Sequence, residues 1–256
     1  MASYESIGRV LLLALMIGCG ADGNANGATN SNETKNNMSA AKSAHSLPVA
    51  TKSEATRLPV ALKPKATRTP VVLFFGTSLT AGYGLDPEQA FPSLIEKKAR
   101  DEGVPIKAIN AGLSGETSAG AVRRIDWVLR TPADLVVIEV GANDALRGLS
   151  TDAARSNLER VIAAVRAKQP NAKLALIQME APPNFGATYT RSFRSIYADV
   201  ARKEGITLLP FLLNGVAGIS RLNQSDGLHP NLSGERIVAD NVWKSLKPIV
   251  AQLDRG

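Results

Sequence analysis

Two residues in separate short segments could carry out nucleophilic catalysis. Ser78 lies in "FFGTSLTAGYGL" (74–85), directly after an apolar run, and His229 lies in "SDGLHPN" (225–231). A serine becomes a nucleophile only when a base takes its proton, and histidine is the base suited to neutral pH. A lone serine beside glycines is more often a turn residue. The interpretation of Ser78 therefore depends on what accompanies it.

Acyl transfer also needs a carboxylate that orients the histidine and donors that stabilise an oxyanion. Asp226 precedes His229 by three residues, so a single turn can bring its oxygen to the imidazole. The backbone amides of Ser78 and Gly112 and the side-chain amide of Asn143 are candidate oxyanion donors. Each residue alone has an ordinary explanation as a turn, a bend or a helix cap. Their joint occurrence favours hydrolysis through an acyl-enzyme.

These residues follow strands of one predicted sheet. Apolar runs predict strands, and amphipathic segments between them predict helices, which together indicate an α/β fold with a parallel sheet covered on both faces. Ligands bind such sheets beyond the carboxyl ends of the strands. The predicted strands are 71–75, 106–110, 134–140, 173–179 and 206–211, and the predicted helices lie near 90–102, 118–130, 152–168, 190–204 and 233–253.

Four segments resemble the conserved blocks of the SGNH (GDSL) hydrolases. They are "FGTSLTAGYG", "NAGLSGETSAG", "GANDALRG" and "DGLHPN", with Ser78, Gly112, Asn143 and His229 as the matching residues. The resemblance extends over 70–256 and is greatest to the bacterial arylesterase and thioesterase/lysophospholipase branch. It implies a flavodoxin-like three-layer sandwich with a five-stranded parallel sheet, and a serine esterase without cofactor. In one departure, Thr77 stands where the family has aspartate.

Other readings of the catalytic segments are weaker or stay open. An α/β-hydrolase needs G-x-S-x-G, but Thr80 stands two residues after Ser78. A metal hydrolase lacks ligands, because His229 is the only histidine in 70–256 and Cys19 the only cysteine in the chain. A carbohydrate O-acetylesterase of the same fold and a non-catalytic binding lipoprotein remain alternatives, since a fold does not select the substrate.

The N-terminus indicates export and anchoring. Arg9 precedes "VLLLALMIG", which is too short to span a bilayer, and the segment ends in "LMIGC". This resembles a lipoprotein signal, so we expect a signal peptide at 1–19, a lipid on Cys19 and a periplasmic or cell-surface location. Residues 20–69 are polar with few large apolar side chains, which predicts a disordered tether ahead of a hydrolase domain at 70–256.

Charge and aromatic residues complete the expectations. The formal net charge is +7, but 70–256 carry 22 basic and 19 acidic side chains without a basic cluster, so no nucleic-acid partner is expected. We expect a monomer that acts on a small ester or lipid. The segment "EAPPNFGATYT" (180–190) is expected to line the acyl pocket, and Trp127 and Trp243 are expected in the core.

Overall fold

The computed structural model describes residues 68–253. The predicted signal peptide, Cys19 and the predicted tether as far as residue 67 lie outside the described residues. Among those that are described, no helix has both the length and the apolar character needed to cross a membrane.

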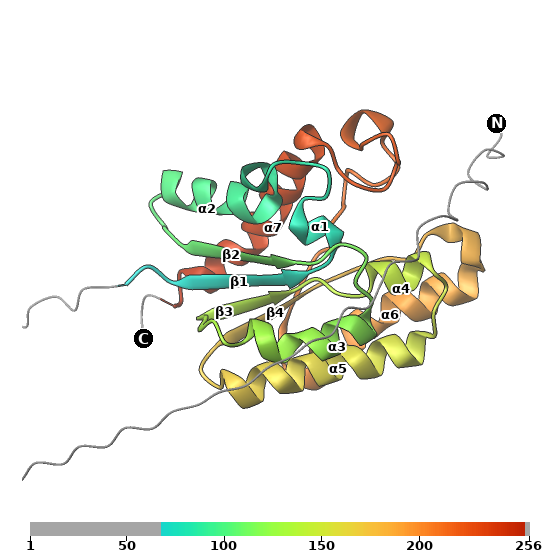
Figure 1. The fold of residues 1–256 in the computed structure, drawn as a ribbon, viewed down its shortest axis with the longest axis horizontal. Helices are drawn as coiled ribbons and strands as arrows, with labels where there is room; N and C mark the ends of the chain where they lie inside the picture. Colours follow the sequence, from blue (N-terminus) through green and yellow to red (C-terminus); the bar gives the residue numbers. More distant parts are fainter. Residues whose placement is uncertain (1–67, 254–256) are drawn as a thin grey trace, which may run out of the picture. The chain divides into compact units, whose positions relative to one another are not determined.

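A five-stranded parallel sheet forms the centre, in the order β2-β1-β3-β4-β5 (Figure 1). The strands are β1 Val71–Gly76, β2 Lys107–Gly112, β3 Leu135–Ile138, β4 Lys173–Ile177 and β5 Thr207–Leu209. From β1 the chain passes to β2 on one side, and then crosses to β3 on the other side of β1. The loops that follow β1 and β3 therefore flank a switch point in the strand order, where parallel sheets bind ligands. The predicted five-stranded flavodoxin-like sheet is confirmed.

Helices cover both faces of the sheet, which makes three layers. In Figure 1, α2 and α7 lie on one face, and α3, α5 and α6 lie on the other. Two short helices, α1 and α4, follow β1 and β3. The helices are α1 Ser78–Ala81, α2 Phe91–Asp101, α3 Ser118–Val128, α4 Ala142–Leu146, α5 Thr151–Lys168, α6 Gly186–Glu204 and α7 Leu232–Val250, with 3-10 turns at Pro87–Gln89, Pro183–Phe185 and Ser220–Leu222.

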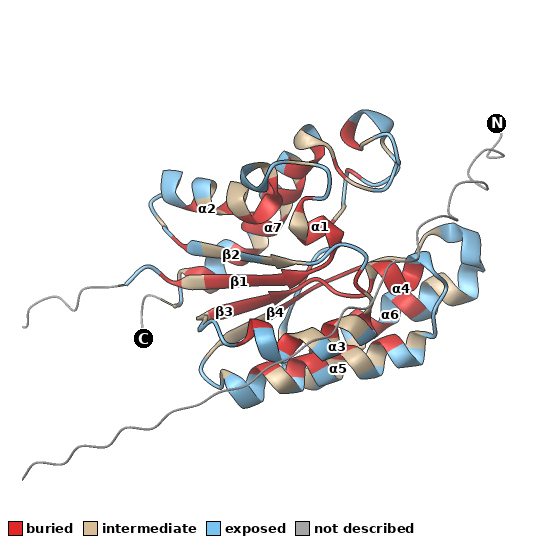
Figure 2. Ribbon diagram, in the orientation of Figure 1, coloured by how far each residue is buried: buried red, intermediate tan, exposed pale blue. Residues whose placement is uncertain are grey.

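The core explains why the strands are apolar throughout. Because helices cover both faces, strand residues such as Leu73 and Phe74 are buried on whichever side they point (Figure 2). Trp243 is buried on α7, as expected. The expectation for Trp127 was wrong: it is 65% exposed on α3, because it points away from the face that holds Ala121 and Ile125 against the core.

Candidate active site

The turn that presents Ser78 is built around a glycine and a buried carboxyl group. A Cβ on Gly76, the last residue of β1, would lie 2.0 Å from Thr80 Oγ1 and 2.6 Å from Glu139 Oε2, so only glycine fits there. The chain then turns directly into α1, whose first residue is Ser78. The sequence pattern placed Ser78 correctly at the carboxyl end of the first strand.

Glu139 anchors this turn from the neighbouring strand end. Its carboxyl group accepts hydrogen bonds from the Thr77 backbone N–H (2.8 Å), Thr77 Oγ1 (3.0 Å) and Thr80 Oγ1 (2.8 Å). Burial raises the pKa of Glu139 to about 7, although these hydrogen bonds oppose the rise. Thr77 stands where the family has aspartate. Its hydroxyl group donates a hydrogen bond to the Glu139 carboxyl group, which holds the loop.

Ser78, His229 and Asp226 form one hydrogen-bonded chain. His229 Nε2 lies 2.9 Å from Ser78 Oγ, and His229 Nδ1 lies 2.6 Å from Asp226 Oδ2. If Nδ1–H donates to the carboxylate, Nε2 is free to accept the Ser78 proton. Partial burial raises the pKa of Asp226, but hydrogen bonds from the His229 ring and from the backbone N–H groups of His229 and Leu228 outweigh it and hold the pKa below the ordinary value.

The segment that carries His229 is fixed by a tight turn. Gly227 has φ 69°, a left-handed conformation that favours glycine and allows Asp226 and His229 to face each other. Gln224 closes the loop: its backbone N–H donates to the His229 carbonyl (2.8 Å), and its side-chain Nε2 donates to the Tyr83 carbonyl (2.6 Å). The Tyr83 ring lies 4.6 Å from the imidazole, centroid to centroid. The loop after β1 thus supports the histidine as well as the serine.

Asn143 reaches the same edge of the sheet from α4. One side-chain N–H donates to the Glu116 carbonyl at 3.0 Å. The Nδ2 group carries two N–H donors, so this contact orients the second without using it. Asn143 lines the same pocket as Ser78 and His229. The structure therefore brings these three predicted residues together.

Gly112 needs a correction as an oxyanion donor. It lies at the end of β2, paired in register with Gly76, but its N–H already has an acceptor, Asn110 Oδ1, at 3.0 Å. The loop bends further on, at Gly115 (φ 78°), whose N–H has no acceptor among residues 68–253. Gly115 adjoins Glu116, which holds Asn143. It is the better candidate, and the second glycine of "GLSG" was the available signal.

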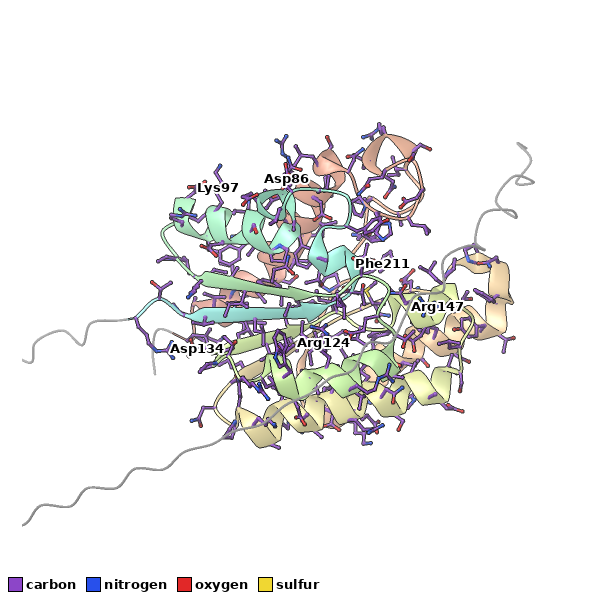
Figure 3. All side chains as sticks on the ribbon, viewed as in Figure 1. Asp86, Lys97, Arg124, Asp134, Arg147 and Phe211 are labelled. Carbon is purple, nitrogen blue, oxygen red and sulfur yellow. The ribbon has the colours of Figure 1, made fainter. Side chains whose placement is uncertain are left out.

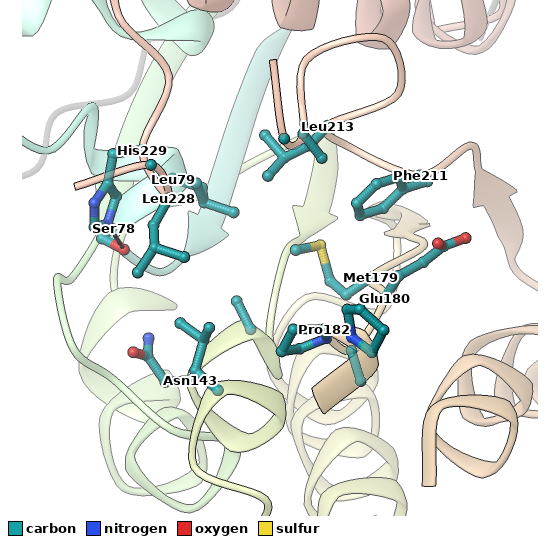
Figure 4. A pocket seen from close by; sticks show the side chains of 17 residues that line it. Ser78, Leu79, Asn143, Met179, Glu180, Pro182, Phe211, Leu213, Leu228 and His229 are labelled. Carbon is teal, nitrogen blue, oxygen red and sulfur yellow. Dashed lines mark hydrogen bonds between the residues drawn. The ribbon is translucent and has the colours of Figure 1, made fainter. Parts of the chain in front are cut away.

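An apolar pocket of about 450 Å³ opens beside these groups (Figure 4). Figure 4 shows Ser78, His229 and Asn143 at one end, and Met179, Pro182 and Phe211 at the other. Residues 180–183 of the segment expected to line an acyl pocket do line it. Leu146 and Leu228 lie at its walls and are partly exposed, so the pocket suits an apolar group bonded to the reacting carbonyl.

Sequence reasoning missed Glu139, Glu116 and Arg124, which support the site without lining the pocket. A glutamate inside the apolar run "DLVVIEV", between Ile138 and Val140, was a signal for Glu139, because an unpaired charge in a buried segment is costly. No cluster of residues capable of holding a metal is found in the described part of the chain. Cys19 lies outside it.

Comparisons with known proteins agree with this geometry. The sequence model of the GDSL-like Lipase/Acylhydrolase family matches residues 74–237. Esterase TesA of Pseudomonas aeruginosa is 40% identical over 181 residues, which are 70% of this chain and 89% of that protein. The arylesterase of Vibrio mimicus is 35% identical, over 68% of this chain and 87% of its own length.

A solved structure extends the likeness to three dimensions. The psychrotrophic esterase EstA from Pseudoalteromonas sp., inhibited by monoethylphosphonate, superposes with a TM-score of 0.67 at 36% identity and covers 71% of this chain and 99% of its own. Fold and sequence thus lead to the same group of proteins. The chain belongs to the GDSL-like lipase/acylhydrolase (SGNH) family and is a serine ester hydrolase.

Proposed function

We propose that Ser78 is the nucleophile of a two-step ester hydrolysis. Ser78 Oγ bonds to the ester carbonyl carbon while its proton passes to His229 Nε2, the carbon–oxygen bond to the alcohol breaks, and His229 returns that proton to the leaving oxygen. Water then repeats the sequence on the acyl-enzyme and releases the acid and free Ser78. The observation that carries this proposal is the continuous chain from Ser78 Oγ through His229 to Asp226, at 2.9 and 2.6 Å.

The proposed oxyanion hole combines three donors. The second N–H of Asn143 Nδ2 is one, and the Gly115 N–H, which has no acceptor among the described residues, is another. The Ser78 N–H is the third, because the first residue of a helix has no intrahelical acceptor for its backbone N–H. Such donors act on the charge that develops in the transition state.

The pocket favours esters with an apolar acyl or aryl part. Aliphatic and aromatic side chains, Leu79 and Phe211 among them, make up much of its lining. One relative of this chain is named for thioesterase and lysophospholipase activity. A panel of p-nitrophenyl esters of increasing chain length tests this class, with acetylated xylan as the competing substrate. Higher kcat/KM for medium or long acyl chains supports the proposal. Preference for acetylated xylan supports the alternative, a carbohydrate O-acetylesterase.

An ethyl p-nitrophenyl phosphonate tests the nucleophile directly, because the attacking serine oxygen bonds to phosphorus, the bond to p-nitrophenolate breaks, and the monoethylphosphonyl group stays covalently bound to the serine. We expect one adduct per chain, located at Ser78 by peptide mass spectrometry, with complete loss of esterase activity. Labelling at another serine, or activity that survives stoichiometric labelling, contradicts the assignment. A non-catalytic binding lipoprotein would give no adduct.

We also propose that the protein is an exported monomer held at a membrane by a lipid on Cys19. The support is the "LMIGC" segment after a short apolar run that follows Arg9. Cys19→Ser should abolish partition into a detergent phase without changing kcat/KM of the domain. Wild-type protein found wholly in the aqueous phase after export contradicts the anchor, and a dimer in sedimentation contradicts the monomer.

A further inference from the structure

Arg124 is a partly buried arginine whose guanidinium group contacts three separate segments at the carboxyl edge of the sheet. It lies on α3, outside the pocket lining, and its side chain is 16% exposed. Figure 3 shows it between α3 and the sheet. We propose that Arg124 is a positioning residue, which holds the oxyanion hole through its contacts with Glu116 and with the ends of β1 and β2.

The first contact is a two-pronged ion pair with Glu116. Arg124 Nε donates to Glu116 Oε1 at 2.8 Å, and Nη2 donates to Oε2 at 2.6 Å. The Glu116 side chain is only 5% exposed, so its carboxylate depends on this partner. Gly120 leaves it the necessary room, because a Cβ there would lie 2.9 Å from Glu116 Cγ. The planar guanidinium thus fixes where Glu116 sits.

The remaining N–H groups bind the strand ends. Nη1 donates to the Ala111 carbonyl (3.0 Å) and Nη2 to the Gly76 carbonyl (3.3 Å). The guanidinium carbon also lies 4.5 Å from the centre of the Phe75 ring, a favourable cation–π arrangement. Phe75 pairs in register with Ala111, so Arg124 joins β1 and β2 where they deliver the catalytic loops.

Each proposed oxyanion donor is close in sequence to a residue that Arg124 contacts, or is hydrogen-bonded to one. Ser78 follows Gly76 by two residues. Gly115 directly precedes Glu116, and Asn143 is oriented by the Glu116 carbonyl. Displacement of a donor by about 1 Å is enough to cost up to about a hundredfold in rate. This inference rests on the oxyanion hole of the proposed function, and deepens it by naming what keeps the donors in register.

The primary test is Arg124→Met, compared with Arg123→Met at the adjacent, exposed position of the same helix. Activity is expressed per active serine, titrated by the p-nitrophenolate released from an ethyl p-nitrophenyl phosphonate, so that misfolded protein does not count. We expect kcat to fall roughly tenfold to a hundredfold with KM nearly unchanged, because only transition-state contacts are weakened. Arg123→Met should stay within about twofold of the wild type.

A double-mutant cycle identifies the route of the effect. If Arg124 acts through Asn143 and its neighbours, Arg124→Met should lower kcat clearly less in an Asn143→Ala background than in the wild type. Full additivity, or a kcat per active serine unchanged by Arg124→Met, overturns the inference while leaving the oxyanion hole intact. An Asn143→Ala variant with wild-type kcat overturns both the inference and the proposed oxyanion hole.

A second variant separates positioning from a mere loss of stability. Arg124→Met leaves the Glu116 carboxylate buried without its partner, and the added change Glu116→Gln removes that charge. We expect the melting temperature of the double variant to recover toward the wild-type value while kcat stays low. Recovery of kcat together with stability would show that the pair serves only the fold and overturns the proposal.

Discussion

The two sides of the active site are held in different ways. On the proton-transfer side, Asp226 and His229 are three residues apart in one turn on the surface, and a local hydrogen bond joins them. On the charge-stabilising side, Asn143 depends on Glu116, whose carboxylate is buried and paired with Arg124 on α3. The first arrangement is local in sequence, whereas the second exists only when several strand ends and a helix meet.

The carboxyl groups differ in the same way. Asp226 is partly exposed, and its hydrogen bonds outweigh partial burial and lower its pKa, so it is ionised and able to hold an imidazolium. Glu139 is buried, and burial raises its pKa to about 7. It serves as an acceptor for Thr77 and Thr80. The difference shows that the carboxylate in the surface turn, Asp226, stabilises charge during the reaction, whereas the buried carboxyl group of Glu139 holds the catalytic loop in place.

The largest expected effect is that of Ser78→Ala. Loss of the nucleophile should lower kcat by roughly a millionfold, as in other serine hydrolases, while the melting temperature stays near the wild-type value. Ser192→Ala, at an exposed position of α6 outside the pocket lining, is the control and should be almost fully active. Retention of a tenth of the activity by Ser78→Ala would mean that another residue attacks the ester.

Asp226→Asn comes next, because it perturbs only the proton-transfer side. The amide keeps the shape but favours the wrong imidazole tautomer, and comparable changes in other triads cost up to about ten-thousandfold in kcat. Steady-state kinetics at neutral pH measure it, with the exposed Asp101→Asn as control. A loss below about tenfold would indicate a Ser78–His229 dyad.

Asn143→Ala perturbs only the charge-stabilising side. Removal of one oxyanion donor costs roughly a hundredfold to a thousandfold in kcat with little change in KM. The exposed Asn214→Ala serves as control. A rise in KM with kcat unchanged would show that Asn143 binds the ground state instead.

The remaining effect leaves catalysis unchanged and concerns stability, through a buried carboxyl group outside the catalytic machinery. Burial raises the pKa of Glu235 to about 8, while the Phe91 N–H, which donates to it at 2.8 Å, opposes the rise. The pKa of Glu235 is higher in the folded protein than in the unfolded chain. Between these two pKa values the unfolded chain loses the proton first, so the free energy of unfolding falls as pH rises.

Glu235→Gln keeps an oxygen for Phe91 and removes this ionisation. The variant should gain up to about 1.4 kcal/mol in free energy of unfolding, relative to the wild type, for each pH unit between about 5 and 8, and no more above that range. Urea unfolding at several pH values measures the difference. A difference that does not change with pH contradicts the raised pKa.

The sequence predicted the parts whose signals are local. Apolar runs located the strands, and "DGLHPN" already contains Asp226 and His229 at the spacing of one turn. The polar loops after the first three strands predicted which edge of the sheet holds the site, because the carboxyl ends of parallel strands lie at the same edge. Ser78 and Asn143 were found for this reason.

The parts that depend on tertiary contacts were missed. No pattern near Arg124 in the sequence predicts that its guanidinium group donates a hydrogen bond to the carbonyl of Gly76, 48 residues earlier. Gly112 was chosen because it ends the strand, but a side chain two residues away, Asn110, accepts the hydrogen bond from its N–H. Trp127 was placed in the core by its type, although it occupies the outer face of α3.

The measurement that tests the division of labour most directly is the pH dependence of kcat/KM for Asp226→Asn and Asn143→Ala, from about pH 6 to 10. Hydroxide can partly replace a missing base, so the defect of Asp226→Asn should shrink as pH rises. The defect of Asn143→Ala should stay constant, because it lies in charge stabilisation. Diverging profiles are the predicted result, and parallel profiles would contradict the assignment of Asp226 to His229.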